Sequence, residues 1–276
     1  MLMTSNMTPP DPPHHASGAL IGHTGFVGQN ILSQTPFNAL YNSKNASSMR
    51  GQSFELVVCA AAPAEKWRAN QFPDEDLKNI QELIGNLKTL RAGRLVLIST
   101  IDVYPTVRGV YEDSPAAGKH HAYGRHRRLL EDFVQDHFAA VILRLPALFG
   151  TGLKKNMLYD LLQGRHPHAI HPDGVFQFYS LAHLWRDIVV TLENQLKVVN
   201  ICSEPQSTQE ILREVFNLSC DNHLSTPAPF YDMRTRHAHC WGKSGNYQYT
   251  KAEIMGELKL FVSHYQSGST KEKVEM

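Results

Sequence analysis

A tyrosine and an arginine four residues apart, Tyr123 and Arg127, lie at the start of an amphipathic stretch of the chain. In a helix, positions i and i+4 share one face, so the guanidinium would lie beside the phenol. A nearby cation lowers the pKa of a tyrosine, whose ordinary value is about 10. The spacing therefore predicts a proton donor and acceptor, although a pair of this kind, taken alone, is more often a surface cation–aromatic contact.

A glycine-rich turn precedes this pair in the chain. The apolar residues 19–21 form a short predicted strand, and Gly22, Gly25 and Gly28 follow it, leading into a predicted helix. Gly22 permits a tight turn, Gly25 lets the backbone approach a pyrophosphate, and Gly28 allows the helix to pack closely on the strand. The N–H groups at the start of the helix favour phosphate binding. The order of strand, turn and helix thus predicts a nucleotide-binding turn.

Four further apolar runs, at residues 37–42, 54–62, 94–100 and 139–150, alternate with helical patterns. Gly93 is the predicted C-cap of the helix that precedes the third run. Continuous apolar strands between amphipathic helices predict an α/β protein with a Rossmann-type, doubly wound parallel sheet. Because ligands bind beyond the carboxyl ends of such strands, we expect Thr100, at the end of the third run, to meet Tyr123 there.

The chain is predicted to have two main parts. Residues 18–150 form a dinucleotide-binding domain, completed by a strand near residues 197–202, and residues 151–268 form a smaller, less regular substrate-binding lobe. Residues 1–17 are rich in proline and are expected to be a disordered tail, and residues 269–276 a frayed end.

Composition argues against several classes of function. A net charge of +1 on 276 residues provides no basic surface for nucleic acid or membranes. No apolar run reaches the length of a membrane span. The four cysteines are scattered, as in proteins of the reducing cytoplasm, and the fifteen histidines lack metal-ligand spacing, so no metal is expected. Metal-dependent chemistry through the histidines is the weakest alternative. We therefore expect a cytoplasmic protein whose partner is a small-molecule substrate.

Together, these motifs resemble the extended short-chain dehydrogenase/reductases of the NAD-dependent epimerase/dehydratase type. The shared stretches are GHTGFVG (22–28), CAAA (59–62), NI (79–80), ISTIDVY (98–104), YGRHR (123–127), LRLPALFG (143–150) and VVNICSEP (198–205). The resemblance spans residues 18 to about 205. It implies an NAD(P)-dependent reductase or epimerase acting on a hydroxy or keto group of a sugar-nucleotide-like or other polar small molecule, by hydride transfer with Tyr123 as acid and base.

The motifs and the resemblance together indicate three groups of site residues. The catalytic group is Thr100, Asp102, Tyr123 and Arg127. The cofactor-binding group is Gly22, Thr24, Gly25, Phe26, Val27, Gly28, Asn42, Ser43, Lys44, Ala60, Ala61, Ala62, Tyr123, Arg127 and Pro146. The substrate-binding group is Lys154, Lys155 and Asn156, where relatives contact substrate phosphates.

The chain also departs from the pattern of the family. Arg127 stands where the family usually has lysine; it keeps the positive charge and could bond the nicotinamide ribose, but with a pKa above about 12 it cannot release a proton. Ile101 and Asp102 replace the Asp-Glu pair of sugar 4,6-dehydratases, which argues against dehydration. The later motif His-Val-Asp-Asp is replaced within YSLAHLW (179–185). These changes leave an alternative, a dinucleotide-binding regulatory or scaffold protein without catalysis.

The second predicted strand is relevant to the choice of cofactor. It ends at Asn42, Ser43 and Lys44, with no acidic residue to accept the ribose 2′-OH of NAD. These polar side chains could instead hold a 2′-phosphate, so NADP is favoured over NAD. Relatives often pair through two helices, and residues 76–87 and 123–133 are the corresponding segments for a possible homodimer.

Overall fold

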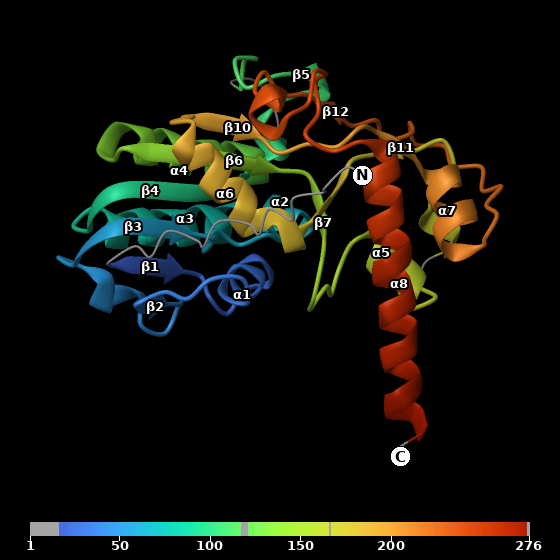
Figure 1. The fold of residues 1–276 in the computed structure, drawn as a ribbon, viewed down its shortest axis with the longest axis horizontal. Helices are drawn as coiled ribbons and strands as arrows, with labels where there is room; N and C mark the ends of the chain where they lie inside the picture. Colours follow the sequence, from blue (N-terminus) through green and yellow to red (C-terminus); the bar gives the residue numbers. More distant parts are fainter. Residues whose placement is uncertain (1–16, 117–120, 166, 275–276) are drawn as a thin grey trace, which may run out of the picture.

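The computed structural model describes residues 17–116, 121–165 and 167–274. Its centre is a six-stranded, all-parallel sheet in the order β10–β6–β4–β3–β1–β2 (Figure 1). The strands are β1 (Gly18–Ile21), β2 (Ala39–Tyr41), β3 (Ser53–Cys59), β4 (Arg91–Thr100), β6 (Ala140–Leu145) and β10 (Val198–Asn200). The predicted Rossmann-type α/β fold is confirmed.

Helices cover both faces of this sheet, as the continuous apolar strands require. Helices α1 (Phe26–Leu32) and α6 (Leu184–Glu193) cover one face, and α3 (Pro73–Leu87) and α4 (Ala122–His137) cover the other (Figure 1). Successive side chains of β1 point to opposite faces. Leu20 packs in the core beneath α1 and α6, whereas Ala19 and Ile21 pack beneath α3 and α4.

The sheet ends at β2. A short loop with η1 (Ala46–Met49) leads from β2 back to β3, which pairs with β1 on its other side. Connections therefore leave β1 and β3 on opposite sides, and the space between their carboxyl ends is the switch point at which ligands of such sheets bind. Gly22 lies directly after β1 at this point, and Ala60 directly after β3.

Two details of the strand prediction were wrong. The run 139–150 is not one strand, because Pro146, which has no N–H to donate, separates β6 from β7 (Ala147–Phe149). Strand β7 leaves the main sheet and pairs with β9 (Phe178–Ser180). Gly93 does not cap a helix but lies within β4, where an added Cβ would come 2.9 Å from the Glu55 carbonyl oxygen.

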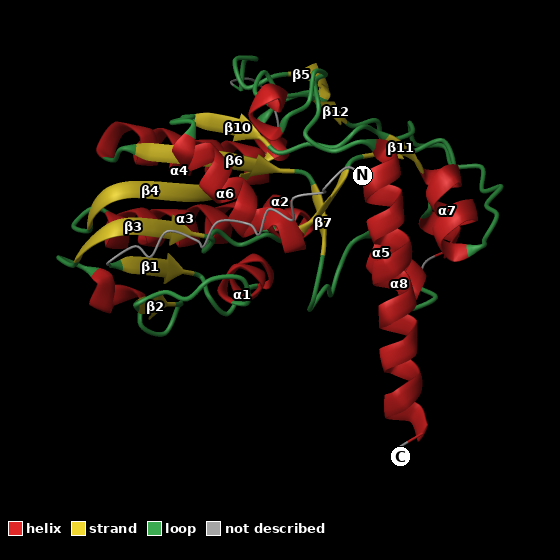
Figure 2. Cartoon of the chain, in the orientation of Figure 1, coloured by secondary structure: helices red, strands yellow, loops and turns green. Residues whose placement is uncertain are grey.

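The remaining elements are short, except for the last helix (Figure 2). They are α2 (Lys66–Gln71), η2 (Ile101–Val103), β5 (Arg108–Val110), α5 (Met157–Leu162), η3 (Pro167–Ala169), β8 (Val175–Phe176), η4 (Leu181–His183), β11 (Gln206–Ser207), α7 (Thr208–Phe216), β12 (Asp232–Met233), η5 (Ala238–Trp241) and α8 (Lys251–Val274). Helix α8 continues into the end predicted to fray. Residues 1–16 of the predicted tail, and residues 275–276, lie outside the described part of the chain.

Within the described residues, no helix is long and apolar enough to cross a membrane. The same residues contain no group of three or more histidine, cysteine, aspartate or glutamate side chains that could hold a metal ion.

Candidate active site

The glycine turn is closed by backbone on two sides. A Cβ added at Gly22, whose φ is 90°, would come 2.5 Å from the Ala60 carbonyl oxygen, and one added at Gly28 would come 2.1 Å from the Gly22 oxygen. A side chain at either position would therefore overlap backbone atoms and force the turn apart. At Gly25 the added Cβ would meet only the Gly22 oxygen, at 3.3 Å. The turn is thus a cradle of backbone in which Gly25 is the least enclosed of the three glycines, and a pyrophosphate can approach such a backbone where no side chain intervenes.

The other predicted cofactor residues border this cradle or the strand ends beside it. Thr24 is exposed, and Phe26 and Val27 are the first two residues of α1. The Ala60 N–H donates to the Ile21 carbonyl at 2.8 Å, which places residues 60–62 beside the glycine turn. Pro146 follows β6 at the same edge of the sheet.

The segment after β2 forms a turn of its own. Asn42 Oδ1 accepts the Lys44 N–H at 2.8 Å, and the Asn42 N–H donates to Asn45 Oδ1 at 2.7 Å. The Asn42 side-chain amide also lies 3.2 Å from His23 Nε2, which links this turn to the glycine turn. The side chains of Ser43 and Lys44 are exposed.

Thr100 and Tyr123 meet at the carboxyl edge of the sheet, as the topology predicts. The Thr100 side chain lies close enough to the Tyr123 phenol to lower its pKa, and Tyr123 is buried at 7% exposure. Two caps hold the start of α4: the Tyr123 N–H donates to Asn70 Oδ1 at 3.0 Å, and the Gly124 N–H donates to His121 Nδ1 at 3.1 Å. A histidine whose Nδ1 accepts must carry its proton on Nε2 when neutral.

Arg127 is bound differently from the sequence-based expectation. Its guanidinium carbon lies 4.2 Å from the centre of the Tyr123 ring, on the ring face. One terminal nitrogen donates to Asp76 Oδ2 at 2.5 Å and the other donates to the Pro63 carbonyl. Both side chains of the Arg127–Asp76 pair are buried. The guanidinium is therefore held by groups of the protein rather than left free for a ribose.

The pKa of Tyr123 also departs from the expectation. The positive charge of Arg127 does lower it, as predicted, and so does the nearby Thr100 side chain. Burial raises the pKa by more than these two effects lower it, and the negative charges of Asp102 and Asp76 raise it further. The net result is a pKa above the ordinary value, so the phenol is protonated at neutral pH.

Asp102 lies in η2, directly after the strand that ends in Thr100, and its own N–H donates to Thr100 Oγ1 at 3.2 Å. Its Oδ1 is 2.5 Å from Lys66 Nζ and 3.6 Å from His121 Nε2. Burial favours the protonated acid, but the hydrogen bond from His121 and the charge of Lys66 outweigh it, so the pKa of Asp102 lies below its usual value. Asp102 is therefore a carboxylate held beside the phenol.

The predicted substrate residues lie on the loop before α5. Lys155 Nζ donates to the Ala64 carbonyl at 2.9 Å, which ties this loop to the segment between β3 and α2, and Lys154 is exposed. Asn156 caps α5: its Oδ1 accepts the Tyr159 N–H at 3.1 Å and its Nδ2 donates to the Leu148 carbonyl at 2.8 Å. Both ends of the Asn156 side-chain amide thus form hydrogen bonds to the backbone of the protein itself.

Comparisons with known proteins identify the fold. No family model and no curated protein sequence matches the chain. The chain has the fold of the extended short-chain dehydrogenase/reductases. Solved structures that resemble it include dTDP-4-dehydrorhamnose reductase from Yersinia enterocolitica, at 15% identity and a TM-score of 0.65, covering 90% of this chain and 99% of that one.

Two further structures of this kind were solved as complexes. UDP-glucose 4-epimerase from Thermotoga maritima, with UDP-glucose, has 15% identity and a TM-score of 0.70, covering 91% of this chain and 99% of that one. RMD from Pseudomonas aeruginosa, complexed with NADPH, has 17% identity and a TM-score of 0.69, covering 92% and 99%. At such identities the similarity establishes the fold of this chain, and its chemistry must be argued from its own residues.

Sequence reasoning missed three side chains at this site: Lys66, Asp76 and His121. His121 had a local signal, because it stands at the N-cap position of the helix that carries Tyr123. Lys66 lies 36 residues from Asp102 in the sequence, on a different helix. Asp76 reaches Arg127 from the neighbouring helix. No spacing rule connects residues on different helices, so these contacts became visible only in the structure.

Proposed function

We propose that this protein is an NAD(P)-dependent reductase or epimerase that acts on a hydroxy or keto group of a sugar-nucleotide-like or other polar small molecule. The observation that carries the proposal is that the Thr100 side chain lies close to the buried Tyr123 phenol, at the carboxyl edge of a sheet that also presents the glycine cradle. The structural neighbours, a sugar-nucleotide reductase and an epimerase with bound UDP-glucose among them, support this reading.

The cofactor is proposed to be a nicotinamide dinucleotide, which supplies the hydride when bound. The cradle fits its pyrophosphate, because Gly25 is open where Gly22 and Gly28 are closed by backbone. Asn42, Ser43 and Lys44 would hold the adenosine ribose end. With no acidic residue at this turn and with two exposed polar side chains, NADP is favoured over NAD.

Tyr123 is the proposed acid of the reaction. Because its pKa lies above the ordinary value, the phenol carries its proton at neutral pH and can donate it to the oxygen of a carbonyl that is being reduced. Thr100 orients the same oxygen. Arg127 cannot supply the replacement proton, since guanidinium does not deprotonate in proteins. Asp102, held by Lys66 and His121, keeps a negative charge beside the phenol and so favours its protonated form.

The substrate is proposed to extend toward the loop before α5. Lys154 is exposed there, and Lys155 Nζ donates to the Ala64 carbonyl in the segment after β3. Two ammonium groups suit a diphosphate. The Asn156 side chain caps α5, so its contribution to a ligand would come through its backbone.

Replacement of Tyr123 by phenylalanine tests the proposal. Purified protein is assayed with NADH and NADPH against a panel of nucleotide sugars and their keto forms. We expect Tyr123→Phe to lower kcat by about 10²–10⁴-fold, the usual contribution of a general acid, while dinucleotide binding persists. The rate of carbonyl reduction in the wild-type protein should fall only as pH rises through the elevated pKa of the phenol.

A matched variant, Tyr265→Phe, removes a phenol whose hydroxyl accepts from Gln163 on the surface, and it should leave kcat unchanged. Equal turnover in Tyr123→Phe and wild type would overturn the proposal.

A non-catalytic dinucleotide-binding protein is the second candidate. The observation that favours it is the commitment of Arg127 to Asp76 and Pro63, where the family uses a lysine. Arg127→Lys separates the two: a modified enzyme keeps its activity or changes it measurably, whereas a protein without catalysis shows no turnover before or after the change.

A further inference from the structure

Arg127 is held between two helices by its ion pair with Asp76. Asp76 belongs to the first turn of α3, and its carboxylate accepts from Arg127 on α4. The two side chains are 5% and 3% exposed. Arg127 Nε has no hydrogen-bond partner among the described residues, so the guanidinium is fixed by its two terminal nitrogens alone. Both of their partners, Asp76 and Pro63, lie outside the helix that carries Arg127.

This arrangement sets where the positive charge lies. With its terminal nitrogens bound to α3 and to the segment after β3, the guanidinium rests on the face of the Tyr123 ring. A lysine at position 127 has a single nitrogen and could not bind the Asp76 carboxylate and the Pro63 carbonyl with the same planar geometry.

Charged groups surround the phenol from every element packed against it. On its own helix it faces Arg127, with His126 held on Asp76 at 2.8 Å. The other groups are His121 at the start of α4, Asp76 on α3, Asp102 on η2, and Lys66 on α2, which lies on Asp102. Arg127 lowers the pKa of Tyr123, whereas Asp102 and Asp76 raise it.

We propose that Asp76 is a positioning residue for Tyr123: it holds the Arg127 guanidinium on the phenol ring and offsets part of its charge. Arg127 is then a fixed cation rather than a ribose ligand or a proton carrier. The inference rests on the proposed function only in giving Tyr123 a catalytic role; the electrostatic coupling of the three side chains can be measured without turnover.

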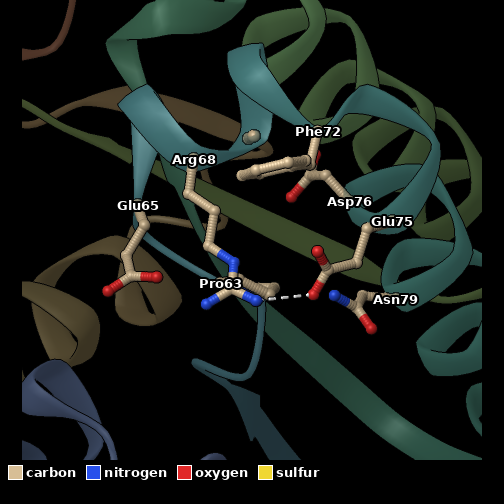
Figure 3. A pocket seen from close by; sticks show the side chains of 8 residues that line it. Pro63, Glu65, Arg68, Phe72, Glu75, Asp76 and Asn79 are labelled. Atoms are coloured by element: carbon tan, nitrogen blue, oxygen red, sulfur yellow. Dashed lines mark hydrogen bonds and ion pairs between the residues drawn. The ribbon is translucent and has the colours of Figure 1, made fainter.

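The surroundings of the pair allow a second test. A cavity of about 290 Å³ is lined by Pro63, Glu65, Arg68, Ala69, Phe72, Glu75, Asp76 and Asn79. Both partners of Arg127 are therefore part of its wall, and the Arg68–Glu75 ion pair, at 2.8 Å, crosses it (Figure 3). A small organic cation in this cavity could reach the carboxylate and the carbonyl that normally hold the guanidinium.

The first experiment measures the ionisation of Tyr123 directly. Protein with ¹³C at tyrosine Cζ is titrated by NMR, and the Tyr123 signal is assigned by its loss in Tyr123→Phe. Asp76→Asn removes a negative charge, so Tyr123 should ionise at lower pH in this variant than in the wild type. Arg127→Gln removes a positive charge, so Tyr123 should ionise at higher pH in this variant than in the wild type. We expect shifts on the order of one pH unit in opposite directions.

A merely structural role for the ion pair predicts a different result. Loss of either partner would then loosen the same contact, and the pKa of Tyr123 would shift in the same direction in both variants. Shifts of the same sign, or none, would overturn the inference. The NMR signals are compared over the pH range in which circular dichroism shows that the fold is intact. At the highest pH of this range, the fraction of ionised Tyr123 ranks wild type and the two variants by the pKa of Tyr123. Asp74→Asn, in the same helical turn but exposed, is the matched control and should not move the signal.

The second experiment covers the case in which Asp76→Asn does not fold. Arg127→Ala is titrated with methylguanidinium, which should restore the Tyr123 ionisation midpoint toward the wild-type value in a saturable manner. The probe should have no effect on the Asp76→Asn/Arg127→Ala double variant. Absence of rescue in Arg127→Ala, or equal rescue in both, contradicts the inference. If the midpoints behave as expected but no substrate turns over, the proposed function fails while the role of Asp76 stands.

Discussion

Gly28 shows how a single position can decide whether a turn forms. Its Cα lies so close to the Gly22 carbonyl that the smallest side chain would overlap the oxygen, and both partners are backbone. Neither can rotate away, in contrast to a clash between two side chains. The glycine turn is thus specified residue by residue, and its place between a strand and a helix is as the sequence predicted.

Gly28→Ala should disrupt this turn. We expect a loss of about 1–3 kcal/mol in the free energy of unfolding, as for an overpacked core, and a loss of dinucleotide binding. Urea unfolding and fluorescence titration with NADPH measure the two effects.

Gly85→Ala on α3 is the control for Gly28→Ala, because an added Cβ there meets no atom within 4 Å. It should stabilise the protein by about 0.5–1 kcal/mol through its helix propensity. If Gly28→Ala behaved like Gly85→Ala, the close approach to Gly22 would be contradicted.

At the scale of elements, α4 carries Tyr123 and Arg127 of the candidate site, and its buried face is fixed to the sheet by hydrogen bonds and an ion pair. Tyr123, Arg127 and Glu131 follow one another at four-residue spacing, on one buried face of the helix. Glu131 accepts from Arg144 of β6 at 2.6 Å and from the Ser99 hydroxyl of β4 at 2.6 Å. The helix is therefore tied to two neighbouring strands of the sheet, β4 and β6, and β4 is the strand that ends in Thr100.

Glu131→Gln should destabilise the protein strongly, because it leaves the Arg144 guanidinium buried without a counter-charge. We expect a loss of about 3–5 kcal/mol in the free energy of unfolding. Asp132→Asn is the neighbouring control: its bond to Arg128 is on the surface, and the loss should be about 0–1 kcal/mol. Comparable losses from the two variants would contradict the anchoring role of Glu131.

The elements that the sequence predicted are the long ones, in which apolar residues recur with the regular spacing of a strand or a helix. Strands β3 and β4 and helices α3 and α4 were expected close to where they lie, because each buries a face of its own. β5 and β12, three and two residues long, carry no such period, and their pairing joins residues more than 120 positions apart. The contacts of Lys66 and Asp76 were not predicted for the same reason. They depend on how helices pack together, and the sequence of a single segment does not determine this packing.

At the scale of the whole molecule, a ligand that binds only the folded state stabilises every element at once. A dinucleotide at 100 times its Kd should add about 2.7 kcal/mol to the free energy of unfolding. We expect a larger rise in Tm with NADPH than with NADH at equal concentration, and Lys44→Ala should narrow the difference. An equal or larger rise with NADH would contradict the proposed NADP preference.

The outer surface of α3 and α4 remains the predicted interface of a homodimer. Leu129 of α4 is 42% exposed on this surface. Leu129→Asp should convert a pair of chains, each of 31.1 kDa, to single chains in light scattering coupled to gel filtration. Leu260→Asp, at a position 62% exposed on α8, should not. A wild-type protein that elutes as a single chain would remove this prediction.

The buried Tyr104 phenol accepts from Arg144 and donates to Asn200, 96 residues further along the chain. During synthesis on a ribosome, at about 5–20 residues per second, that interval takes about 5–20 seconds. Until β10 emerges, strand β6 is an open edge of the sheet, and the Arg144 guanidinium beside it has only part of its final surroundings. The nascent chain therefore passes through a period in which helix α4 has been made but the sheet beneath it is incomplete, and this is the interval in which we expect it to depend on chaperones.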